Sequence, residues 1–194
     1  MNTFVRNVHR FLYGPPASKV TMIQRGSYAG SNPADCYEWG RLPFNAWKTM
    51  PLYPPGKGAS PGDEYDTTGG EMTRSTGPLL GLRAPEDGLY AVTFGGVIDT
   101  NGEANNVHFR LGRNIATDSQ WGTGYGAFAS HCPGRAQHAS DGMARFIGSI
   151  ATTINLKKGD MVSASGVADK DFILGRRDVP GRSFLEMRWV GRAP

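Results

Sequence analysis

The stretch Gly88-Leu-Tyr-Ala-Val-Thr-Phe-Gly-Gly-Val-Ile98 decides the fold class. Tyr90, Val92 and Phe94 alternate with smaller or more polar residues, and Ile98 continues the same parity. An alternation of period two places one set of side chains on one face of a pleated strand. The stretch therefore predicts a long β-strand whose buried face carries these aromatic and branched residues.

The residues after this strand predict further short strands separated by turns. The run Asp99-Thr-Asn-Gly102 is a strong turn signal, and Lys157-Lys-Gly-Asp160 is a second tight turn. The further predicted strands are Val107–Leu111, Phe146–Leu156, Met161–Val167, Phe172–Leu174 and Ser183–Val190. The segment 121–129 is rich in glycine and aromatic residues and fits either a strand or a loop.

Composition and spacing exclude a helical fold. The 194 residues include 27 glycines and 13 prolines, a density of helix breakers that long helices do not survive. Hydrophobic residues make up 39% of the chain, which is enough for a core. Because no helical segments separate the strands, parallel βαβ units are not expected. We predict an all-β protein with the antiparallel β-sandwich of a jelly roll.

Residues 1–40 differ from the rest of the chain. Apolar residues recur at near-helical spacing between Phe4 and Leu12, and Gly14-Pro-Pro16 then ends the pattern. We predict an extended N-terminal arm over 1–40, with a short helix near its start, and a jelly-roll domain over 41–194. Within that domain, the proline-rich run 50–76 predicts a long irregular loop that serves as a contact surface.

Charge, hydropathy and cysteine content narrow the range of partners. The formal net charge is +4 with scattered basic residues, whereas nucleic-acid binding normally uses a denser basic stripe. No stretch approaches the roughly 18 apolar residues of a membrane span, and the first residues lack a secretory h-region. We therefore expect no nucleic acid, no membrane, and synthesis in a host cytoplasm. Cys36 and Cys132 are expected to be two free thiols rather than a disulfide.

The sequence carries no strong catalytic or metal-binding motif. The segment His131-Cys-Pro-Gly-Arg-Ala-Gln-His138 has ligand types without a zinc spacing, and the acidic cluster Asp63–Asp66 matches no calcium loop. A Gly-x-x-x-x-Gly-Lys phosphate loop does not occur. We expect a protein that is not an enzyme and has no catalytic residues, no metal and no cofactor. His108 alternates with core positions and is expected to face solvent or a neighbouring subunit.

Four motifs in one order give a more specific indication. They are Leu42-Pro-Phe-Asn45, Tyr65-Asp-Thr-Thr-Gly69, Pro85-Glu-Asp-Gly-Leu-Tyr90 and Leu156-Lys-Lys-Gly-Asp-Met-Val162. Over residues 41–194 this order resembles the jelly-roll family of complement globular heads and tumour-necrosis-factor-like ligands. Similar jelly rolls form the trimeric decoration, spike and fibre-tip proteins of tailed bacteriophages. The resemblance implies three copies around a threefold axis.

The resemblance, together with the short arm, implies a virion structural protein made without a secretory signal. We expect a homotrimer that decorates or cements the outside of a phage head and binds the major capsid protein. The arm residues expected to contact the capsid are Phe4, Arg6, Arg10, Phe11 and Arg25. The residues expected at the trimer interface are Tyr90, Phe94, Phe109 and Trp189. The alternative is the receptor- or glycan-binding tip of a tail fibre or head spike. Both alternatives place the protein on the virion.

Overall fold

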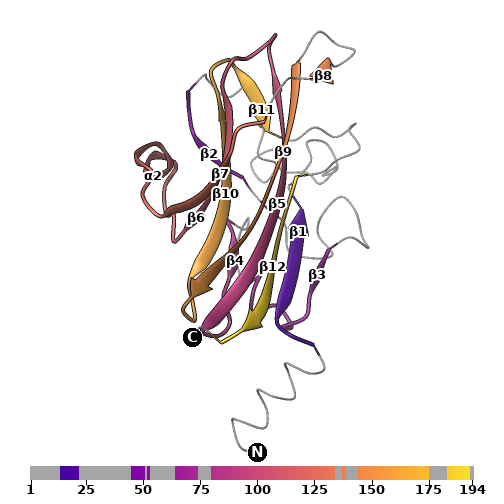
Figure 1. The fold of residues 1–194 in the computed structure, drawn as a ribbon, viewed down its shortest axis with the longest axis vertical. Helices are drawn as coiled ribbons and strands as arrows, with labels where there is room; N and C mark the ends of the chain where they lie inside the picture. The colour runs from indigo at the N-terminus through magenta and orange to yellow at the C-terminus, as the bar shows by residue number, and fades with distance from the viewer. Residues whose placement is uncertain are drawn as a thin grey trace, which may run out of the picture.

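The computed structural model describes residues 14–21, 45–50, 52, 64–73, 80–133, 137–138, 144–174 and 183–192. Most of these residues lie in antiparallel β-strands that form two facing sheets (Figure 1). The elements are β1 (Ala17–Thr21), β2 (Lys48–Thr49), β3 (Tyr65–Asp66), β4 (Leu82–Arg83), β5 (Gly88–Thr100), β6 (Val107–Arg113), α2 (Asp118–Thr123), β7 (Ala127–His131), β8 (Gln137–His138), β9 (Ala144–Leu156), β10 (Met161–Ala168), β11 (Phe172–Leu174) and β12 (Phe184–Gly191).

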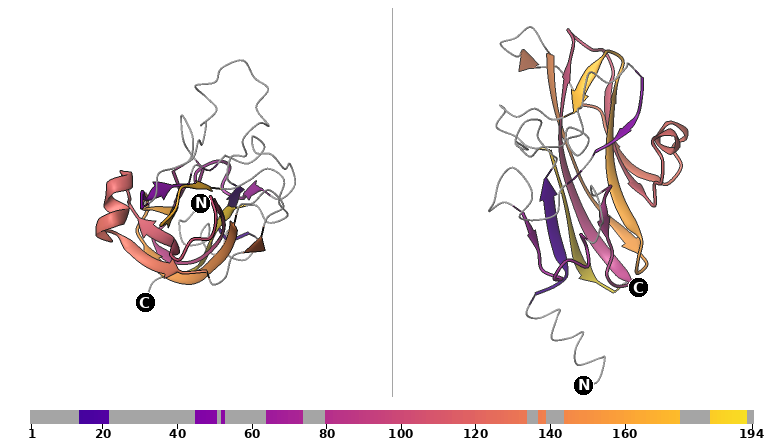
Figure 2. Two further views of the ribbon diagram at one scale, coloured as in Figure 1. Left: turned by 90° about the horizontal axis from the view of Figure 1, so that it is seen from above. Right: turned by 180° about the vertical axis from the view of Figure 1, so that it is seen from behind.

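The two sheets have different strand orders. The first sheet has the order β3-β1-β12-β5-β9-β8, and β11 also pairs with β5. The second sheet has the order β2-β10-β6-β7, and β4 also pairs with β10. Seen along the long axis, the sheets curve around a shared interior (Figure 2). The prediction of an all-β sandwich is therefore confirmed.

The predicted alternation sets which side chains face the interior. β5 and β9 contain 13 residues each and pair along their full lengths. The alternate residues buried on β5, β9 and β12 are Tyr90, Val92, Phe94, Phe146, Ile150, Leu185, Met187 and Trp189. The long apolar strands thus bury one face each, as their period of two predicts.

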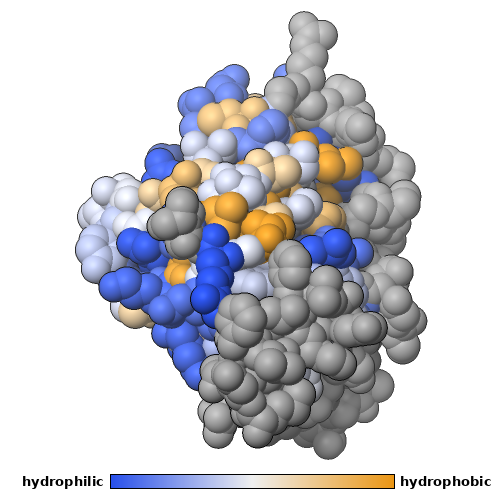
Figure 3. Space-filling model, turned by 60° about the horizontal axis from the view of Figure 1, so that its bottom comes forward, coloured by the Kyte–Doolittle hydropathy of each residue, from blue (hydrophilic) through white to orange (hydrophobic). Residues whose placement is uncertain are grey.

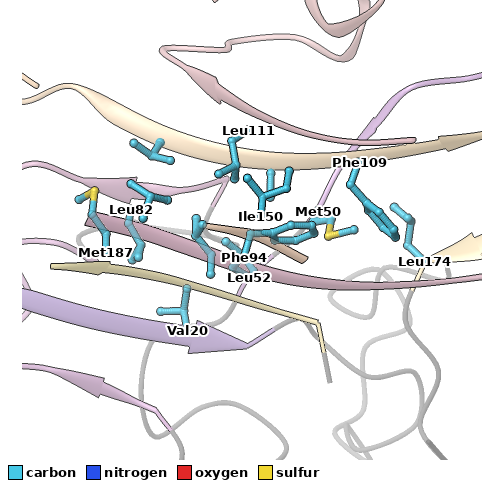
Figure 4. Packing of buried hydrophobic residues seen from close by; sticks show 14 of the residues in the cluster. Val20, Met50, Leu52, Leu82, Phe94, Phe109, Leu111, Ile150, Leu174 and Met187 are labelled. Atoms are coloured by element: carbon cyan, nitrogen blue, oxygen red, sulfur yellow. The ribbon is translucent and has the colours of Figure 1, made fainter. Parts of the chain in front are cut away.

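The core fills the space between the sheets. Figure 4 shows Phe109 and Leu111 reaching from the second sheet toward Phe94 and Ile150 of the first. The Phe94 and Phe109 ring centroids lie 5.6 Å apart at an interplanar angle of 56°. Tilted aromatic pairs at this separation are favoured by the ring quadrupoles in addition to the area that they bury.

The two predicted turns are present, but neither is a hairpin. The β5–β6 connection contains Gly102 at φ 81°, and the β9–β10 connection contains Gly159 at φ 92°. Glycine adopts these left-handed conformations without the steric cost of a Cβ. Because β5 and β9 belong to the first sheet and β6 and β10 to the second, each turn carries the chain from one sheet to the other.

Two segments predicted to lie outside the sandwich belong to it. Residues 17–21, within the predicted arm, form β1, which lies between β3 and β12. Within the predicted loop 50–76, Met50 and Leu52 are fully buried in the core, and Tyr65–Asp66 form β3. The rest of the predicted arm, 1–13 and 22–40, lies outside the described residues. Both corrections have the same cause, because short strands in proline-rich sequence gain their stability from partners far along the chain.

A six-residue helix, α2, covers part of the outer face of the second sheet (Figures 1 and 2). It buries Trp121 against Gly112 of β6, where an added Cβ would lie 2.8 Å from the indole ring. Gln120 Oε1 accepts hydrogen bonds from the backbone N–H groups of Ala116 and Thr117, which begins the helix. The segment 121–129, left open between strand and loop, contains the end of this helix and most of β7. Among the described residues, no helix has the length and apolar character needed to cross a membrane.

The buried hydroxyl of Tyr90 makes the stability of the fold depend on alkaline pH. Burial raises the pKa of Tyr90 to about 12, and its hydroxyl donates a 2.7 Å hydrogen bond to the Glu86 carbonyl. The neutral phenol is thus favoured in the folded state, so its contribution is complete below pH ~10, the unfolded pKa. It is lost as the pH rises toward about 12, the folded pKa.

We expect the free energy of unfolding to fall by about 2 kcal/mol between pH ~10 and ~12 from this residue alone. Denaturant titrations across that range measure the loss. Tyr90→Phe removes the titrating group, so its stability should decline less over the same interval. Equal slopes in the two proteins would contradict the assignment.

Candidate functional site

The aromatic residues predicted at a trimer interface lie inside the chain's own core. Tyr90, Phe94 and Phe109 are 0% exposed, and Trp189 is 7% exposed. This corrects their predicted role, because a side chain packed between the two sheets cannot also contact a second subunit. A large aromatic residue on an alternating strand gains more by filling the core of its own domain.

On β5 and β9, the residues that alternate with the buried ones form part of the outer face of the first sheet. On β9 the side chains of this parity from Ile147 to Asn155 are exposed, with Ile147 at 46%. On β5 those from Leu89 to Gly95 are partly buried, and at the end of the two strands Asp99 and Arg145 form an ion pair at 2.8 Å. In register, Ala91 lies opposite Thr153 and Thr93 opposite Ala151. We name this surface the neutral face; it consists of Leu89, Ala91, Thr93, Gly95, Ile147, Ser149, Ala151, Thr153 and Asn155.

No member of the neutral face carries a charge, although strands that face water usually alternate apolar with polar or charged residues. Its side chains are small or medium in size and lie on the two longest strands of the sheet. Depletion of charge is a mark of the centre of protein–protein interfaces. Figure 3 shows one side of the molecule on which apolar and pale residues occupy the middle and strongly hydrophilic residues lie beside them.

Charged residues lie beside the neutral face, on β12 and β1. Tyr65 donates a 2.6 Å hydrogen bond to Glu186 Oε1, and Arg188 lies 3.8 Å from the same oxygen. Burial, followed by the hydrogen bond to Glu186, raises the pKa of Tyr65. Lys19 lies over the Phe184 ring, 5.1 Å from its centroid. A polar margin around an uncharged centre is the usual arrangement of an association surface.

The outer face of the second sheet is polar and charged by contrast. Lys48 Nζ lies 2.5 Å from Asp118 Oδ2, and Thr49 donates to Asp118 Oδ1 from both its backbone and its hydroxyl at 2.9 Å. Burial alone raises the pKa of Asp118, but the hydrogen bonds from Lys48 and Thr49 outweigh it and hold the pKa below its ordinary value. Trp121 Nε1 donates to Thr49 Oγ1 at 2.8 Å, which ties α2 to β2.

The sequence candidates for metal and thiol chemistry have defined positions. Cys132 is a free, exposed cysteine, and its sulfur lies 2.8 Å from His108 Nδ1. His108 is partly exposed on the outer face of the second sheet. In the acidic cluster, Asp66 accepts hydrogen bonds from Thr68 and from Thr73 within its own loop. The described part of the chain contains no group of three His, Cys, Asp or Glu residues placed to hold a metal ion.

The predicted capsid-binding residues Phe4, Arg6, Arg10, Phe11 and Arg25 lie outside the described residues, and so does Cys36. Their roles stay predictions. The neutral face, which sequence reasoning missed, has a signal in the sequence. No charged residue occurs between Gly88 and Ile98 or between Phe146 and Leu156. Strand segments without charge on either parity are typical of strands whose two faces are both covered.

Comparison with known proteins adds no relative. No known family model matches the chain, and no curated protein matches it significantly. The neutral face and the polar face of the second sheet are therefore interpreted from their own chemistry.

Proposed function

We propose that this chain is a jelly-roll protein that forms homotrimers and decorates or cements the outside of a phage head, without enzymatic activity. The strand order supports the jelly roll. The paired strands are nested along the chain: the innermost pair is β6–β7, followed outward by β5–β9, β4–β10 and β1–β12. Such nested antiparallel pairs, divided between two sheets, are what wrapping one long double strand into a sandwich produces.

The neutral face is the observation that carries the proposed assembly. It presents small uncharged side chains on the two 13-residue strands, beside a margin that contains Glu186 and Arg188. Burying such a surface releases water from apolar groups and leaves no charge unpaired. Three copies related by a closed rotation each bury it against the next copy, in line with the resemblance to trimeric jelly rolls.

Attachment to the head is assigned to the N-terminal segment. β1 begins beside the end of β12, since Ala17 lies opposite Arg188. The start of β1 therefore lies at this end of the sandwich, at the bottom of Figure 1. Apolar and basic residues that precede it in the sequence, such as Phe4 and Arg6, suit a groove with acidic margins between capsid subunits. Because these contacts form only on the assembled head, binding of the chain favours the assembled head over its separate subunits.

Light scattering during size-exclusion chromatography tests the assembly, with a trimer of the 20.9 kDa chain as the expected result. Immunolabelling and quantitative mass spectrometry of intact particles test the location. Tens to hundreds of copies distributed over the head are expected for a decoration protein. A monomer in solution, or absence from particles, would overturn the proposal.

The alternative role is the receptor- or glycan-binding tip of a tail fibre or head spike. It is favoured by one specific observation, a polar hollow at the end of the sandwich opposite the start of β1. Copy number separates the two roles, because a tip is present in few copies at a tail or vertex.

A further inference from the structure

A hollow of about 280 Å³ opens on the outer face of the second sheet. It lies where β6 begins and β10 ends, near the upper end of the sandwich in Figure 1. Its volume is close to the lower limit of about 300 Å³ for small-molecule sites, so it suits one small unit. Its lining consists of Asn45, Trp47, Asn106, His108, Arg110, Val167, Ala168 and Asp169.

The basic wall of the hollow is held in a fixed position. The Arg110 guanidinium carbon lies 4.1 Å from the centroid of the Trp47 ring, and Arg110 Nη1 donates to the Trp121 carbonyl at 2.5 Å. Stacking and this hydrogen bond together orient the guanidinium plane. His108 Nδ1 contacts the Cys132 sulfur, so Nε2 is the ring nitrogen that remains for a ligand.

The opposite wall is also held by backbone contacts. Both carboxylate oxygens of Asp169 accept from the Asn105 backbone N–H, at 3.1 and 3.2 Å. The Asp169 N–H donates to the Asn106 carbonyl, and the Asn45 N–H donates to the Ala168 carbonyl. Asn45 has φ 58°, a left-handed conformation that asparagine adopts more readily than other non-glycine residues.

We propose that this hollow binds a single neutral hexose unit of a surface glycan. A sugar hydroxyl both donates and accepts, and the hollow offers donors and acceptors of each kind: two carboxamides, a carboxylate, an imidazole and a guanidinium. The C–H face of a sugar is apolar, and Val167, Ala168 and the Trp47 indole provide an apolar lining for it.

The charges of the lining favour a neutral ligand over a charged one. Arg110 and Asp169 contribute one charge of each sign. A ligand with a single charge of either sign would therefore meet one like charge as well as one opposite charge, so the lining gives no net preference for an acidic or a basic ligand. A neutral hydroxylated ring meets no like charge and can use both groups as hydrogen-bond partners.

The position of the hollow keeps it open in a decorated particle. The chain enters the sandwich at β1 and leaves it at β12 at the same end, whereas the hollow lies toward the other end. A protein attached through its N-terminal segment therefore presents the hollow away from the particle. The sugar site goes beyond the proposed structural role and does not require the trimer.

Saturation-transfer NMR, with ¹H–¹⁵N correlation spectra of the labelled full chain, tests the proposal against glucose, galactose, mannose, sialic acid and an acidic peptide. Binding of at least one of the three neutral hexoses is expected, with amide shift changes at Asn45, Asn106 and His108. Binding only of sialic acid or of the peptide would overturn the proposal, as would shift changes confined to other parts of the chain. A failure of trimer formation would leave this measurement unaffected, so the two proposals fail separately.

Matched variants test the named residues. Asn106→Ala removes the carboxamide and keeps the backbone carbonyl that accepts from Asp169. We expect it to weaken hexose binding about tenfold, as the loss of one to two hydrogen bonds implies. Asn101→Ala, at an exposed position in the β5–β6 connection outside this lining, is the control and should bind as the unmodified chain does. If Asn106→Ala unfolds the protein, His108→Gln provides the same comparison. Unchanged affinity in a folded variant would contradict the site.

Discussion

Gly148→Ala is expected to lower the free energy of unfolding by about 1–3 kcal/mol, or more where the core cannot adjust. Gly148 of β9 lies directly opposite Gly96 of β5, and the Phe109 ring from the other sheet packs against both. An added Cβ at Gly148 would lie 2.6 Å from Phe109 Cδ2 and 2.9 Å from His131 Cδ2. The glycine pair thus gives the ring the room that brings the two sheets together.

A double-mutant cycle separates this contact from a general loss of strand stability. Phe109→Ala alone should cost about 3–5 kcal/mol, because it leaves a cavity at a fully buried position. Combined with Gly148→Ala, the loss should fall short of the sum by at least about 1 kcal/mol, since the added methyl group now has space. Gly191→Ala is the control, because an added Cβ there meets nothing within 4 Å. Urea denaturation measures all four variants, and strict additivity would contradict the packing argument.

Ala151→Glu is expected to dissociate the proposed trimer. Ala151 is exposed on the neutral face, opposite Thr93, and no charged residue belongs to that face. Burying an unpaired carboxylate in a subunit interface costs several kcal/mol. We therefore expect the dissociation constant to rise at least about 100-fold, with little change in the stability of each subunit.

Light scattering across a concentration series measures this change, and circular dichroism checks that the sandwich remains folded. Ser119→Glu adds the same charge at an exposed position of α2, on the other side of the molecule. This control should leave the association unchanged. If Ala151→Glu associates as the unmodified chain does, the neutral face is not the interface.

Local alternation in the sequence correctly predicted the strands that form the body of the fold. The segments 88–98, 146–156 and 183–190 each coincide with a long strand of the first sheet. The buried side chains of the first of these segments are also the predicted ones, as Phe94 illustrates. This success has a simple cause, because a period of two is a property of neighbouring residues and needs no knowledge of the partner strand.

The surface was harder to predict than the core. The aromatic residues Tyr90, Phe94, Phe109 and Trp189 attracted the prediction of an interface, yet each is buried in its own chain. Large aromatic residues are common both in protein cores and in subunit interfaces, so residue type does not distinguish the two. The absence of charge between Gly88 and Ile98 and between Phe146 and Leu156 is the more informative signal.

The sequence alone thus determined an all-β chain, the positions of its long strands and the side chains that face inward, because these depend on local periodicity and on turn-forming residues. Only the tertiary structure decided which strands pair, that both glycine turns cross between sheets, and that residues 17–21 belong to the sandwich. The pairing of Ala17 with Arg188 and the packing of Phe109 on Gly148 join residues that are distant along the chain. Such contacts depend on the combined burial of many segments, which no single stretch of sequence encodes.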